Sequence, residues 1–289
     1  MGQNVRLIGL ILLVIVLAVL GYRGLFGERP AHDLMVVSAN RASIQGLTYG
    51  DSTGLEPGQI VGVNDVVKTA ANGSAALQYG DGAQVMLSEA TVMRVLNADA
   101  TGVQIDLGEG EVTARVRQGA PPLDIVTKSR TIRGSDADFT VMVTRDGGFS
   151  TMAQRGQISV LGSEGGQSIR SGVAVHSQKG GALLIEPVTE NLLLDVEWPE
   201  ETRTRLSEVE VSGQTDPYAT VTVGTGPEAV RVRSDRDGRF RATVKLREGE
   251  NEVTLKVRDV AGREAIRVQK VRRDSTAPVM QAAEVVWGP

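Results

Sequence analysis

The stretch Val103-Gln-Ile-Asp-Leu-Gly-Glu-Gly-Glu-Val-Thr-Ala-Arg-Val116 alternates apolar and polar residues on both sides of a glycine-containing triplet. Apolar residues at every second position are typical of a half-buried β-strand, with one face toward the core and the other toward water. The triplet Gly108-Glu109-Gly110 predicts a corner between two such strands, because glycine adopts positive φ without steric cost. This alternation, rather than any helical period, decides the fold.

The same pattern extends outward from this stretch. Alternating runs recur at Gly73 to Tyr79 and Gln84 to Leu87, and turn signals fall at Gly80-Asp81-Gly82 and Asp146-Gly147-Gly148. The 34 glycines and the aromatic content of only 3% suit short strands joined by tight turns. We therefore predict an all-β domain over residues 36–186, built as a sandwich, a roll or a short solenoid of strands.

The order and spacing of several short motifs in this region resemble the FecR domain of bacterial envelope proteins. The motifs are Asp65-Val-Val-Lys-Thr69, Gly73-Ser-Ala-Ala-Leu77, Asp81-Gly-Ala-Gln-Val-Met-Leu87, Leu107-Gly-Glu-Gly-Glu-Val112, Ile125-Val-Thr127, Arg155-Gly-Gln-Ile-Ser-Val160 and Ile169-Arg-Ser-Gly172-Val-Ala-Val. One departure is that Gly134-Ser135 stands some residues ahead of Phe139, where the family has Gly-Thr just before an aromatic residue. The resemblance implies a transmembrane regulator whose cytoplasmic region handles a sigma factor. Since only about six residues precede the predicted anchor, we do not expect this chain to bind a sigma factor itself.

A second all-β domain is predicted after a connecting segment, residues 187–198. Alternation resumes at Val209 to Val211, Ala219 to Val223, Val230 to Val232, Phe240 to Leu246, Glu252 to Val257 and Ala265 to Val268. Strands at this spacing predict a β-sandwich over residues 199–275. Asp237-Gly-Arg-Phe240 and Asp259-Val-Ala-Gly262 are similar to bacterial Ig-like domains, which implies a spacer or a protein-contact module. The tail, residues 276–289, ends in the apolar Val285-Val-Trp287, which either folds back or adds to a partner's sheet edge.

Residues 7–22 form an uncharged apolar run, Leu7 to Tyr22. Its length approaches the roughly 20 residues that a membrane-spanning helix needs. We predict an anchor over residues 1–27, a linker over residues 28–35, and a single-pass inner-membrane protein with its bulk in the periplasm. The alternative is a cleaved signal peptide, which the absence of a clean Ala-x-Ala site disfavours. In either case the bulk of the chain is exported.

Composition excludes several classes of protein. The chain has no cysteine, so lipoprotein anchoring, disulfides and thiolate metal sites are excluded. The formal net charge of −4 disfavours a nucleic-acid partner, because dedicated nucleic-acid binders are normally basic.

The sequence offers no grouping suited to catalysis. His32 and His176 are the only histidines, too few and too far apart for a ligand cluster, and we expect both to be solvated. Asp235-Arg-Asp237-Gly238 is interpreted as a hairpin turn, since it lacks the further oxygen ligands of a calcium loop. We therefore predict no enzymatic activity, no cofactor, no metal and no small-molecule substrate.

The candidate binding residues flank that turn. Arg231 and Arg233 alternate with valines before it, and Arg239 and Arg241 alternate with apolar residues after it. If the two strands pair, the four guanidinium groups share one face that could bind anionic groups of a lipid or wall polymer. The alternative is a solvated face balanced by neighbouring carboxylates.

Together these features predict a membrane-anchored, non-catalytic protein of the bacterial cell envelope that binds or scaffolds another envelope protein or a cell-wall polymer. The alternative function is signal transduction, in which the outer domains sense a partner.

Overall fold

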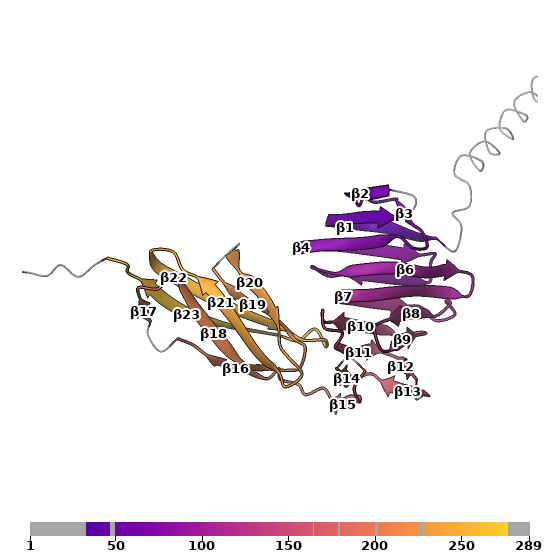
Figure 1. Ribbon diagram of the computed structural model, residues 1–289. Coiled ribbons are helices and arrows are strands. Elements are labelled where there is room, and N and C mark those ends of the chain that lie inside the picture. Colours follow the sequence, from indigo (N-terminus) through magenta and orange to yellow (C-terminus); the bar gives the residue numbers. More distant parts are fainter. Residues whose placement is uncertain are drawn as a thin grey trace, which may run out of the picture. The chain divides into compact units, whose positions relative to one another are not determined.

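The computed structural model describes residues 33–46, 50–163, 165–178, 180–199, 202–225 and 228–276. All the regular elements among these residues are β-strands, so the all-β prediction is confirmed (Figure 1). The predicted anchor, residues 1–27 with the apolar run at 7–22, lies outside the described residues. Within the described ranges, no helix has the length and apolar character needed to cross a membrane.

The chain divides into two compact units. The first comprises Met1–Gly147 and Ala153–Ser171, and the second comprises Gly148–Met152 and Gly172–Pro289. The strands of the first unit are β1 (Leu34–Gly46), β2 (Gly50–Gly54), β3 (Ile60–Val61), β4 (Val66–Tyr79), β5 (Ala83–Leu87), β6 (Val92–Asp99), β7 (Gly102–Val116), β8 (Leu123–Val126), β9 (Thr131–Gly134), β10 (Asp138–Val143), β12 (Gln157–Gly162) and β13 (Gly165–Arg170). Strand β11 (Phe149–Arg155) begins in the second unit and ends in the first.

Strand β7 is the hub of the first unit. It pairs with β6 and β8 along its first half and with β5 and β10 along its second half. Because one strand changes neighbours along its length, the sheet must bend over on itself, which favours a roll or solenoid over a sandwich of two separate sheets. Alternating side chains of these strands are buried, including Leu77, Ile105 and Phe139, and they form the core.

The corner predicted within the opening stretch is wrong. The chain runs straight through Gly108-Glu109-Gly110 as part of β7. Opposite this triplet the register with β6 shifts between Val92 and Met93, so one extra residue of β7 is accommodated as a β-bulge. Gly110 has φ +108°, and a Cβ there would lie 2.4 Å from the Cα of Thr91. Glycine is therefore required here for a bulge rather than for a turn.

The other two predicted corners are confirmed. The chain reverses between β4 and β5, where the Gly82 amide donates to the carbonyl of Tyr79 at 3.2 Å. Between β10 and β11, the Gly147 amide donates to the carbonyl of Thr144 at 2.9 Å, and Gly147 has φ +95°.

The second unit holds β14 (Val173–Ser177), β15 (Leu184–Pro187), β16 (Leu194–Glu197), β17 (Arg203–Thr204), β18 (Glu208–Thr215), β19 (Thr220–Gly224), β20 (Val230–Arg233), β21 (Arg239–Lys245), β22 (Gly249–Arg258) and β23 (Glu264–Arg273). Strands β16-β18-β21 form a three-stranded sheet, and β17-β23-β22-β19-β20 form a five-stranded sheet.

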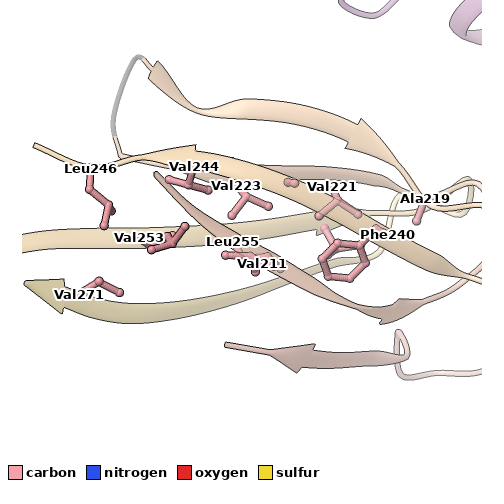
Figure 2. Packing of buried hydrophobic residues seen from close by; sticks show 13 residues of the cluster. Val211, Ala219, Val221, Val223, Phe240, Val244, Leu246, Val253, Leu255 and Val271 are labelled. Carbon is pink, nitrogen blue, oxygen red and sulfur yellow. The ribbon is translucent and has the colours of Figure 1, made fainter. Parts of the chain in front are cut away.

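These two sheets share one hydrophobic core. Val211 and Phe240 come from the three-stranded sheet, and Val221 and Leu255 come from the five-stranded sheet (Figure 2). All four are buried, and the residues beside them in each strand point outward, as the alternation in the sequence predicts.

Candidate functional site

The four arginines singled out in the sequence lie on two different sheets. Arg231 and Arg233 are in β20, which pairs with β19, whereas Arg239 and Arg241 are in β21, which pairs with β18. The predicted shared face requires β20 and β21 to pair with each other. They do not pair, because the turn between them carries the chain from one sheet to the other.

The turn itself is held by Asp235. Its Oδ1 accepts hydrogen bonds from the backbone amides of Asp237 at 2.9 Å and Arg239 at 2.8 Å. Gly238 has φ +77°, and its amide donates to the carbonyl of Asp235 at 3.0 Å. The interpretation of Asp235 to Gly238 as a turn is confirmed, although it links two sheets instead of closing a hairpin within one.

Three of the four arginines meet in a groove of about 450 Å³. Its charged lining consists of three basic residues, Arg233, Arg239 and Arg241, and three acidic residues, Asp195, Glu197 and Asp235. Arg241 is also 3.4 Å from the carboxylate of Glu210. Equal numbers of opposite charges lower the attraction for a dedicated polyanion, so the charge balance favours the solvated-face alternative.

Arg231, the fourth candidate arginine, does not line this groove. Its Nε donates to the hydroxyl of Thr222 at 3.4 Å, across the pair of strands β19 and β20. The anion-binding role of the four arginines remains a prediction, and the structure assigns them to two environments.

Sequence reasoning missed a buried cluster around Arg263. The Arg263 side chain is 19% exposed, and its Nε donates to the Asp259 carboxylate, itself 3% exposed, at 2.7 Å. A second guanidinium nitrogen contacts both Asp259 and the carboxylate of Asp216. The third nitrogen donates to the carbonyls of Thr189 at 2.5 Å and Asn191 at 3.0 Å. We call these five residues the Arg263 clamp.

The clamp joins three segments that are distant in sequence: the connecting segment before β16, the loop before β19, and the loop between β22 and β23. Burial raises the pKa of Asp216, against the opposing attraction of Arg263, and the nearby charge of Asp259 adds to the rise. Every nitrogen of the guanidinium already donates to a protein oxygen, so the clamp has no donor left for a ligand. Its role is structural.

His176 lines a cavity of about 120 Å³ together with Asp216, Asp259 and Arg263. It is only 6% exposed, so the expectation that it is solvated is wrong. Burial lowers its pKa to about 4, which keeps the imidazole neutral near neutral pH. Its ring centroid lies 6.0 Å from that of Tyr218. The neutral imidazole is therefore packed in the interior of the unit. The cavity beside it has room for little more than a few water molecules.

The other histidine, His32, lies outside the described residues. Among the residues that the structure does describe, no group of three or more His, Asp or Glu side chains is arranged to hold a metal ion.

Comparison with protein families gives a match to part of the chain. Residues 65–160 match the family described as "FecR protein", a span that runs from β4 into β12. Comparison with curated protein sequences gives no match.

Several solved structures show some likeness to the chain, among them the following three. Two are crystal structures of a protein from Parabacteroides distasonis ATCC 8503 that is provisionally assigned as an anti-sigma factor, at 18% and 17% identity. In both, the TM-score is 0.38, and the match covers 42% of this chain and 59% of that protein. The third is a tetra-tandem repeat from the extending region of a large adhesion protein, at 11% identity and a TM-score of 0.25, covering 86% of this chain and 93% of that one.

Proposed function

We propose that this chain is a non-catalytic component of an envelope signal-transduction system, in which its β-domains contact a partner protein outside the cytoplasm. The observation that carries the proposal is the FecR match over residues 65–160. Members of that family are regulators rather than enzymes, as the motif resemblance in the sequence also implies. In this proposal, residues 7–22 anchor the chain in the inner membrane and the bulk lies in the periplasm.

The second unit supports a contact role. Its two sheets around one core fit the immunoglobulin-type sandwich that the sequence suggests, an architecture common in spacers and cell-surface modules. The polar groups of the Arg263 clamp hydrogen-bond to one another, as in a structural module. We propose that this unit is Ig-like and that it presents a surface to the partner.

The topology can be tested on a cysteine-free background, because the natural chain contains no cysteine. Ser168→Cys in the first unit and Thr243→Cys in the second place a thiol at exposed positions. We expect a membrane-impermeant maleimide to label both variants in intact spheroplasts. Labelling only after lysis would contradict the periplasmic placement.

The regulatory role is tested by deleting the gene and comparing transcripts. We expect a change confined to one small set of genes, restored by the full chain. A purely scaffolding protein would instead give an envelope defect, such as detergent sensitivity, with no focused transcript change. That second outcome would favour the binding or scaffolding interpretation over signalling.

A further inference from the structure

Strand β23 leaves a long part of its outer edge open. Its inner edge pairs with β22 through ten consecutive residue pairs, from Gly249 with Arg273 to Arg258 with Glu264, without a register shift. On the outer edge, the only strand that the described residues provide is the two-residue β17, opposite Arg272 and Arg273. From Glu264 to Lys270, no described strand pairs with this edge.

The backbone of this open part is oriented to accept another strand. The Arg272 amide donates outward to the carbonyl of Thr202 at 2.7 Å. Because N–H and C=O groups alternate sides along a strand, the amides of Lys270, Val268 and Ile266 point to the same outer edge. The pairing with β17 shows that this edge of β23 accepts a strand, and a bound segment would lie along the same edge next to β17.

The side chains beside this edge are unusual for an exposed strand. Ile266 is 53% exposed and Val268 is 50% exposed, and both project from the outer face of the five-stranded sheet. The open part contains no proline or bulge, two devices that natural edge strands use against pairing, although Arg267 and Lys270 supply the charge that is a third. Edge strand β15 differs, because it ends in Pro187.

The charged residues beside the open edge of β23 indicate which kind of strand can bind there. Arg267, Lys270 and Arg272 are exposed along β23, and Lys256 and Arg258 lie on the neighbouring β22, against three acidic residues, Glu264 on β23 and Glu250 and Glu252 on β22. Glu264 is engaged 2.9 Å from the Lys256 ammonium on the neighbouring strand. The open edge is thus apolar and net positive, so a second copy of the same strand would be repelled, whereas an acidic strand would be attracted.

We propose that the outer edge of β23, from Glu264 to Lys270, binds an extended acidic segment of a partner protein by strand addition. Main-chain hydrogen bonds supply affinity, and Ile266 and Val268 pack beside apolar residues of the segment. Lys270 on the same face and Arg267 on the opposite face select aspartate or glutamate in the segment. The proposal rests on the partner-binding part of the proposed function and identifies the surface involved.

The test is a selection of ten-residue peptides from a random display library on the full-length chain in detergent micelles. We expect enrichment of acidic peptides with alternating apolar residues. Val268→Pro removes an outward amide without breaking the ladder to β22, so the chain should fold while binding falls about tenfold or more. Hydrogen exchange on the wild-type complex should show slower exchange of the Ile266 and Val268 amides.

Charge selection is tested by Arg267→Glu with Lys270→Glu, matched by Arg94→Glu with Lys68→Glu, an exposed arginine and lysine of the first unit. We expect the first pair to lose acidic peptides and to enrich basic ones, and the second pair to bind as wild type. Peptides that bind the Val268→Pro variant unchanged would overturn strand addition. A preference unaffected by charge reversal would overturn the acidic partner.

Two further outcomes would assign a different binding partner to this edge. A concentration-dependent dimer of the chain, lost in Val268→Pro, would show that a second copy occupies the edge. Binding to phosphatidylglycerol vesicles that depends on Arg267 and Lys270 but not on the proline would assign the face to a membrane surface. Since these measurements use purified chain, they succeed or fail independently of the transcript experiment that tests the signalling role.

Discussion

The Arg263 clamp and the groove at Arg239 and Arg241 contain the same kinds of side chain under opposite conditions. In the clamp, one largely buried guanidinium is fully occupied by two carboxylates and two carbonyls. In the groove, Arg241 is mostly exposed and 3.4 Å from a half-exposed glutamate. The comparison teaches that burial, and not the number of arginines in a stretch, decides whether an arginine stabilises the fold or faces a solvated surface.

The largest expected effect is at the clamp. Arg263→Met leaves Asp216 and Asp259 without their cation, and removing one partner of a buried ion pair typically costs about 3–5 kcal/mol. Chemical denaturation, followed by hydrogen exchange in the second unit, measures this loss in the free energy of unfolding. Arg263→Lys, which keeps the charge but not the planar fork, should lose less. A loss below about 1 kcal/mol for the methionine variant would mean that the cluster is effectively solvated.

The second effect is a pH dependence of the same unit. The pKa of His176 is lowered to about 4 in the folded chain, from 6.5 when exposed. The unfolded chain therefore binds more protons in that window, and the stability contributed by the neutral ring is lost as pH falls. Between about pH 7 and pH 5 the loss should be about 2 kcal/mol. His176→Gln should remove this part of the pH slope, and an unchanged slope in that variant would contradict the assignment.

A pair in the first unit gives an intermediate case. Arg133 donates two hydrogen bonds of 2.7 Å to the two oxygens of Asp124, which is mostly buried while the arginine is half exposed. Arg133→Met should cost about 1–2 kcal/mol, since a bidentate charged pair exceeds an ordinary hydrogen bond but solvent screens it here. Thermal unfolding of the first unit checks this value. A loss as large as at Arg263 would show that burial of the carboxylate alone sets the cost.

The smallest effect belongs to the groove. Arg241→Met should change the free energy of unfolding by about 0.5 kcal/mol or less, because exposed pairs gain little from their attraction. Salt should reduce even this difference, and denaturation at low and high ionic strength measures it. A salt-independent loss of several kcal/mol would place Arg241 in the same category as Arg263 and would remove the contrast between the two sites.

Much of the fold could be predicted from alternation alone. Val221 and Leu255 are buried as the period of two requires, and the turn at Gly80 to Gly82 lies where its glycines indicate. The prediction of a corner at Gly108 to Gly110 was wrong because two closely spaced glycines can form a β-bulge as well as a corner. The difference depends on the register of the neighbouring strand β6, which the local sequence does not contain.

The site was less predictable, for a related reason. The expected face of four arginines required β20 and β21 to pair, but the turn at Asp235 leads to another sheet. The clamp was missed because Arg263 depends on Asp216, a residue far away in sequence. The spacing of Asp259 and Arg263 was the only local signal. The burial of His176 is likewise set by packing against a distant residue, Tyr218.

Strand β11 has a consequence for how this protein can be dissected. Its first residues, up to Met152, belong to the second unit and pair with β14, while its last residues belong to the first. No single cut in the gene therefore releases both units whole. A fragment starting at Gly172 would lose the β11 partner of β14 and keep only β15 beside it, and one ending at Ser171 would expose the edge of β11 that β14 covers, which favours pairing with other chains.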